Sequence, residues 1–161
     1  MEIFEPTEKF FNSILFRTYY YLPREFGKKL ERNTLKSIVS VIDSYYSYST
    51  YDVGHSNQHF FSEVLKNARV HGGKIDEKNI YCGIFLNKEE FCFGCYDGGE
   101  YFRRNEIKQI WENKLPLIEP RHKTNDSETG FGFGYDMLRR TKNTELFVDT
   151  EKGIVYFKRK I

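Results

Sequence analysis

The sequence predicts an α+β fold, a two-layer sandwich in which helices pack on one face of a mixed, largely antiparallel sheet. Three observations predict it. Apolar residues recur at helical spacing through the first half of the chain, and two later stretches have the apolar runs and short turns of β-hairpins. The order of elements is helices, hairpin, long loop, helix, hairpin. A length of 161 residues fits a single domain over residues 1–161.

Residues 1–54 are predicted to form a helical lead-in to the rest of the domain. A short edge strand is expected at residues 2–4. Apolar side chains then recur at helical spacing from Phe10 to Tyr19, which predicts a helix that Pro23 ends.

Two further helices are predicted before the first hairpin. One runs from Leu30 to Tyr46. The next takes Ser56 as its N-cap and ends at His71, because two glycines follow and glycine fits the left-handed position after a helix. Its apolar stripe consists of Phe60, Phe61, Val64, Leu65 and Ala68.

The remaining elements are two hairpins around a long polar segment. The first hairpin pairs residues 79–86 with 91–96, and the second pairs 145–149 with 154–160. The polar segment 98–129 has one short helical patch, residues 103–113. The last helix is expected at residues 135–140.

Composition limits the classes of partner. With 25 Lys and Arg against 23 Asp and Glu, the net charge of +2 gives no electrostatic reason to expect nucleic acid or a membrane surface. No apolar window reaches 18 residues and no apolar stretch opens the chain, so neither a membrane span nor a signal peptide is expected. We expect a cytoplasmic protein.

Three cysteines cannot complete a disulfide framework. Cys82 and Cys92 are predicted to be small core residues. Cys92 and Cys95 have the spacing of half a zinc site, but they lie within a predicted strand and no second pair exists, so no metal is expected there.

The first candidate site is on the third helix. Glu63, Asn67 and His71 stand at i, i+4 and i+8, and so share one side of the helix. A carboxylate can deprotonate or orient a nucleophile, and an amide oxygen is a hard ligand that suits Mg²⁺. The alternative is an ordinary solvated helix face.

The second candidate is the sequence from Asp97 to Gly99, after a predicted strand. A carboxylate accepts a hydrogen bond from an exocyclic amino group such as that of adenine, and glycine lets a planar base approach the backbone. The alternative is an ordinary turn, since Asp-Gly is a common turn signal.

The third candidate is the alternating sequence Gly130, Phe131, Gly132, Phe133, Gly134, which opens the last predicted helix. Glycines allow backbone N–H groups to converge on phosphate oxygens at a helix N-terminus. The spacing fits neither a Walker A loop nor the dinucleotide-binding fingerprint. The alternative is a flexible hinge.

The order of these three motifs resembles the GHKL, or Bergerat-fold, ATPase family, which includes histidine kinase-like ATPase domains. The sequence is most similar to the small anti-sigma-factor serine kinases. The likeness covers residues 55–161. It runs through 62–72, which resembles the family N box, 96–99, which resembles the G1 box, and 129–134, which resembles the G2 box.

The resemblance implies a role for each matched residue. Glu63 would be the catalytic acid that activates a water or an acceptor hydroxyl, and Asn67 would bind Mg²⁺. Asp97 and Gly99 would form the adenine pocket. The phosphates of ATP would be wrapped by Gly130, Gly132 and Gly134, and residues 100–129 would be a lid over the nucleotide.

The resemblance implies a Mg-ATP-binding ATPase or protein serine/threonine kinase in partner-switching regulation. One small domain carries no acceptor of its own, so a protein partner is implied. The alternative is a non-catalytic module with the same fold, because Tyr101 and Ile154 stand where the family often has Gly and Thr. The Tyr- and Phe-rich first 50 residues offer either a homodimer or partner surface or part of the core.

Overall fold

The structure, a computed structural model, describes residues 4–23, 25–71, 79–96, 144–149 and 151–161. The elements in these residues are β1 (Phe16–Leu22), α1 (Lys28–Tyr45), α2 (Val53–Ser56), α3 (Gln58–His71), β2 (Ile80–Leu86), β3 (Glu90–Tyr96), β4 (Thr144–Asp149) and β5 (Ile154–Lys160). The strands form one sheet in the order β1-β2-β3-β5-β4. Each of these neighbouring pairs is antiparallel. The α+β sandwich is therefore confirmed.

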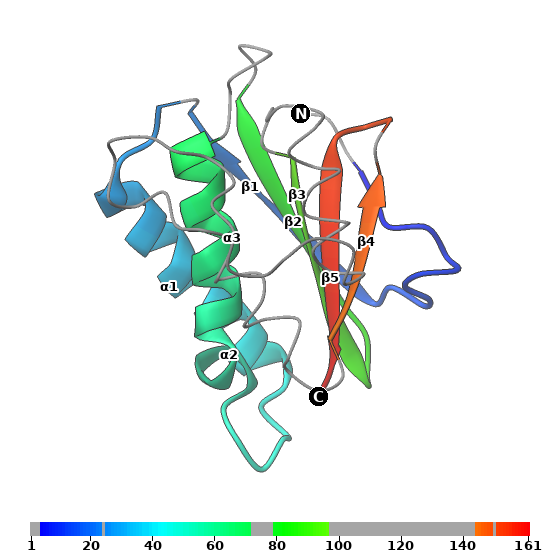
Figure 1. Cartoon of the computed structure of the whole chain (residues 1–161). Helices are drawn as coiled ribbons and strands as arrows, with labels where there is room; N and C mark the ends of the chain where they lie inside the picture. The colour runs from blue at the N-terminus through cyan, green and yellow to red at the C-terminus, as the bar shows by residue number, and fades with distance from the viewer. Residues whose placement is uncertain (1–3, 24, 72–78, 97–143, 150) are drawn as a thin grey trace, which may run out of the picture.

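The three helices cover one face of the sheet (Figure 1). The main core lies between the layers, and the predicted apolar stripe of α3 is buried in it. Phe60 contacts Phe157 of β5 at 5.1 Å between ring centroids, and Phe61 contacts Phe91 of β3 at 5.5 Å. Burying one such side chain stabilises the fold by about 1.5–3 kcal/mol. Aromatic packing therefore sets how α3 lies on the sheet.

The opposite face of the sheet is covered by the N-terminal segment, residues 4–15 (Figure 1). Phe4 is the centre of this second cluster, with its ring 5.4 Å from that of Tyr19 and 5.9 Å from that of Phe85. Gly83 leaves room for it, since a Cβ there would lie 2.9 Å from the Phe4 ring. The central strand β2 is buried along its whole length because both faces of the sheet are covered.

The helix predicted from Phe10 to Tyr19 is wrong. Residues 16–22 form β1, which pairs with β2, and the chain before it has Ser13 in the left-handed region at φ 57°. Phe10 and Ile14 pack on the second cluster without forming a helix. The aromatic, β-branched composition of Phe16–Leu22 favours a strand once β2 is available for pairing.

The other helices were predicted more closely. The second predicted helix is α1, and the third is α3, which ends at His71 as expected. Ser56 as the N-cap of the third helix is wrong, because Ser56 is the last residue of α2. Asn57 separates the two helices, and its side-chain amide donates to the backbone oxygen of Val53 at 2.7 Å.

Both predicted hairpins are confirmed, as β2–β3 and β4–β5. Phe4, the one described residue of the edge strand expected at 2–4, is not in a strand. The helices predicted at 103–113 and 135–140 and the lid at 100–129 lie outside the described residues. In the described part of the chain, no helix combines the length and the apolar composition needed to cross a membrane.

Candidate functional site

Helix α3 places Glu63 and Asn67 one turn apart, and both residues are half-buried. The helix forms because its apolar residues recur at helical spacing and bury one stripe against the sheet. The two polar residues are therefore held in fixed relative positions on a rigid element. This pairing is the part of the predicted site that the described residues contain.

The Asn67 side chain has a buried polar atom that makes no hydrogen bond within the described residues. Its Nδ2 is inaccessible to water and has no hydrogen-bond partner among the described residues. A buried amide nitrogen in this condition costs about 1–3 kcal/mol. Rotation about χ2 exchanges the amide nitrogen and oxygen, so the same group can offer a donor to an anion or an acceptor to a cation. The Asn67 amide therefore has the donor and acceptor chemistry that its predicted role requires.

An ion pair ties α3 to α1 close to this position. Arg69 Nε contacts Glu31 Oε2, and each side chain is 15 % exposed. A charge-assisted contact between two mostly buried groups restricts how α3 rotates on α1. The orientation of the Glu63 and Asn67 side of α3 is therefore fixed from the helix layer as well as from the sheet.

The other predicted site residues, Asp97, Gly99, Gly130, Gly132 and Gly134, lie outside the described residues. Strand β3 ends at Tyr96, one residue before Asp97 in the sequence. The Tyr96 ring stacks on that of Tyr81, with centroids 4.5 Å apart and planes inclined by 13°. The end of β3 is thereby anchored to β2.

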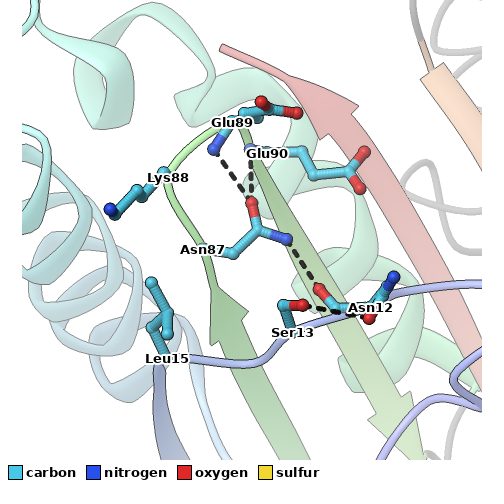
Figure 2. Close-up of a pocket in the computed structure, with 7 residues that line it drawn as sticks. All are labelled: Asn12, Ser13, Leu15, Asn87, Lys88, Glu89 and Glu90. Atoms are coloured by element: carbon cyan, nitrogen blue, oxygen red, sulfur yellow. Dashed lines mark hydrogen bonds between the residues drawn. The ribbon is translucent and has the colours of Figure 1, made fainter.

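A pocket of about 430 Å³ that the sequence did not reveal lies at the turn between β2 and β3 (Figure 2). The Asn87 side chain organises it. Asn87 Oδ1 accepts from the backbone N–H groups of Glu89 and Glu90, each at 2.9 Å, and Nδ2 donates to the backbone oxygen of Asn12 at 2.9 Å. Both the oxygen and the nitrogen of the amide thus help to hold the turn, which indicates a structural role.

A second pocket of about 460 Å³ lies on the helix layer, between α1 and the start of α3. Asp43, one of the residues that line it, is hydrogen-bonded to α2. The carboxylate accepts from the Gly54 backbone N–H at 2.6 Å and contacts His55 Nδ1. Asp43 therefore caps the N-terminal end of α2. Neither this pocket nor the one at the turn is lined by Glu63 or Asn67.

The predicted burial of two of the cysteines is confirmed. Cys82 and Cys92 are fully buried in the core. Burial raises the pKa of the Cys92 thiol well above its ordinary value. In the described ranges no cluster of three or more His, Cys, Asp or Glu side chains is arranged to hold a metal ion.

Compared with known proteins, the chain matches no protein-family model and no curated protein sequence.

Proposed function

We propose that this chain binds Mg-ATP as a GHKL-type domain and acts as an ATPase or a protein serine/threonine kinase. The observation that carries the proposal is the buried side-chain nitrogen of Asn67, which has no hydrogen-bond partner among the described residues and lies one helical turn from the half-buried Glu63. Two further points support it. The helices lie on one face of an antiparallel sheet, and the three glycine- and acid-containing motifs follow in the order that the family resemblance requires.

The residues present fit a hydrated Mg²⁺ ion bound with the phosphates. Asn67 would hold the ion through its amide oxygen, a hard ligand suited to Mg²⁺. When bound, Mg²⁺ neutralises charge that develops on the phosphoryl oxygens. Protein Mg²⁺ sites commonly combine one or two carboxylates with substrate phosphates and several waters, so the nucleotide phosphates and waters would supply the ligands besides the Asn67 oxygen.

Glu63 would act on the nucleophile. In this proposal its carboxylate accepts the proton of a water molecule or of a partner's Ser or Thr hydroxyl as that oxygen attacks the γ-phosphorus. Asp97 and Gly99 would receive the adenine. The backbone at Gly130, Gly132 and Gly134 would surround the phosphates. Positioning and electrostatic stabilisation supply most of the rate in phosphoryl transfer, so the rigid attachment of α3 matters directly.

The test of this function is Glu63→Gln, which removes the base and keeps the shape. We expect the rate of Mg-ATP turnover to fall by about 10²–10⁴-fold, because a positioned general base contributes that much. The affinity for Mg-ADP should change by less than about threefold. Glu151→Gln, in the exposed β4–β5 turn, is the matched control and should leave turnover unchanged. Loss of both turnover and binding in Glu63→Gln would mean that Glu63 is not the base.

The second candidate function is a non-catalytic module in which nucleotide binding governs a protein partner. The observation in its favour is Ile154, at the position where the family often has Thr. Ile154 is 1 % exposed and belongs to the cluster on the face opposite the helices. It therefore offers the nucleotide no hydroxyl. Tight Mg-ADP binding together with no turnover that depends on Glu63 would favour this alternative.

A further inference from the structure

The thiols of Cys82 and Cys95 face each other across the β2–β3 hairpin. The two residues are directly paired in the register, and their Sγ atoms lie 3.2 Å apart. Both belong to the core beneath the helices, where Cys82 is 0 % and Cys95 4 % exposed. Neither is in a disulfide, and the third cysteine, Cys92, lies in the cluster on the other face of the sheet.

The hydrogen bonding at the β2–β3 turn determines whether Cys82 and Cys95 form a hydrogen-bonded or a non-hydrogen-bonded pair of the ladder. Asn87 N–H donates to Glu90 O at 3.1 Å, so Asn87 and Glu90 are a hydrogen-bonded pair flanking a two-residue turn. Hydrogen-bonded and non-hydrogen-bonded pairs alternate along an antiparallel ladder. In the register, Cys82 and Cys95 are the fifth pair from Asn87 and Glu90, and they therefore form a non-hydrogen-bonded pair.

A non-hydrogen-bonded pair is the one in which side chains approach most closely. Its Cα atoms are about 4.5 Å apart. A disulfide accepts Cα separations from about 4.4 to 6.8 Å, so a pair of this kind lies within the range that a disulfide can bridge. The β2–β3 turn already closes one end of the hairpin, and a link between Cys82 and Cys95 would close the open end.

We propose that Cys82 and Cys95 are a redox-sensitive dithiol that forms a cross-strand disulfide when a peroxide oxidises it. Cys95, the more accessible thiol, attacks one peroxide oxygen and becomes a sulfenic acid, releasing one water. The Cys82 sulfur then attacks the Cys95 sulfur, the S–O bond breaks, and a second water leaves. Two thiols thus lose two electrons and two protons to one hydrogen peroxide. Because both thiols are buried, the reaction requires local opening of the hairpin end and is slow.

The Cys82–Cys95 disulfide would also change nucleotide binding, and this consequence rests on the proposed function. Cys95 lies two residues before Asp97, which that function assigns to adenine. Formation of the Cys82–Cys95 disulfide does not depend on nucleotide binding. The experiment below contains no nucleotide, so failure of the disulfide and failure of ATP binding are separate results.

The experiment treats the folded full-length protein with hydrogen peroxide, blocks remaining thiols with iodoacetamide, and maps tryptic peptides without reduction. Trypsin cleaves after Lys88, which separates Cys82 from the peptide that holds Cys92 and Cys95. We expect a linked pair of these peptides whose mass is their sum less two hydrogen atoms, with the iodoacetamide adduct on Cys92. Excess dithiothreitol should abolish the linked pair.

The variants assign the bond. Cys92→Ser is the matched control and should keep the linked pair, whereas Cys95→Ser should lose it. The location of the adduct in the wild-type linked peptide gives the same answer if Cys95→Ser does not fold. A link through Cys92, a link only between two chains, or oxidation beyond sulfenic acid with no link would overturn the proposal.

Discussion

The guanidinium of Arg159, near the end of β5, donates a hydrogen bond from Nη1 to Oδ1 of Asn57, the single residue between α2 and α3. This contact joins the last strand of the sheet to the junction of two helices. Burial lowers the pKa of Arg159, so its charge is partly desolvated and depends on such partners. Asn57 is itself 6 % exposed.

Asn57→Ala should therefore destabilise the fold by about 2–3 kcal/mol, because it removes a partner from a desolvated charge and from the Val53 carbonyl. Urea unfolding followed by circular dichroism measures this change. Asn33→Ala, on the exposed side of α1, is the control and should shift the free energy of unfolding by less than about 0.7 kcal/mol. Equal effects from the two variants would show that the junction does not depend on this contact.

The Tyr46 hydroxyl connects the end of α1 to the β2–β3 turn. It lies 2.8 Å from the backbone oxygens of both Asn87 and Glu90. Tyr46→Phe should reduce the free energy of unfolding by about 1–3 kcal/mol, since it removes from a buried place the one O–H that the two carbonyl oxygens share. Tyr48→Phe removes a similar bond, to the Lys88 oxygen at 3.0 Å, but Tyr48 is 67 % exposed.

The Tyr48→Phe control should cost less than about 0.5 kcal/mol, because water replaces the lost partner at an exposed site. Chemical unfolding of both variants under one set of conditions gives the comparison. A larger loss in the free energy of unfolding for Tyr48→Phe than for Tyr46→Phe would show that burial does not explain the stabilisation by the Tyr46 hydroxyl.

Alkaline pH provides a separate test of Tyr46. Burial raises its pKa above the ordinary value of 10.0, so the folded state binds this proton more tightly than the unfolded state does. The stabilisation is therefore complete below about pH 10 and is lost as pH rises further. Between about pH 10 and about pH 11, the wild type should lose about 1 kcal/mol more stability than Tyr46→Phe. If the free energy of unfolding changed with pH by the same amount in the two proteins, the raised pKa of Tyr46 would be contradicted.

Gly54 allows α2 to cross α1 closely. A Cβ at this position would lie 2.3 Å from the Val39 backbone oxygen and 2.9 Å from Asp43 Oδ1. Gly54→Ala should lower the free energy of unfolding by about 2–4 kcal/mol, because backbone must move to relieve the overlap. At Gly27, the N-cap of α1, a Cβ meets nothing within 4 Å. Gly27→Ala should therefore cost less than about 1 kcal/mol in the same thermal or urea assay.

Local patterns in the sequence predicted those elements whose partners are close in the chain. The two hairpins follow from apolar runs on either side of a short turn, and α1 follows from apolar residues at helical spacing. Strand β1 is not predicted because its partner is β2, whose paired residues lie 58–70 positions later in the chain, and no local sequence pattern indicates so distant a pairing. Phe10 and Phe11 were expected in a helix, yet they belong to an irregular segment that packs on the second face of the sheet, with Phe11 buried and Phe10 partly buried.

For the candidate site, the sequence predicts only which residue types share one side of a helix. The i, i+4 spacing of Glu63 and Asn67 could be read from the sequence, but the burial of the Asn67 nitrogen could not, because it depends on tertiary packing. Cys82 was predicted as a core residue, and Cys95 was considered only as part of a CxxC spacing with Cys92. Their cross-strand contact appears only once the hairpin register is known.

The most direct test of the central claim is a calorimetric titration of the full-length protein with Mg-ADP and with a non-hydrolysable Mg-ATP analogue. We expect saturable binding by the wild type and by Asn33→Ala, and a loss of about tenfold or more in the Mg²⁺-dependent affinity of Asn67→Ala. Circular dichroism of each variant verifies that it is folded. Absence of binding by the folded wild type at millimolar nucleotide would contradict the account, as would unchanged Mg²⁺-dependent affinity in Asn67→Ala.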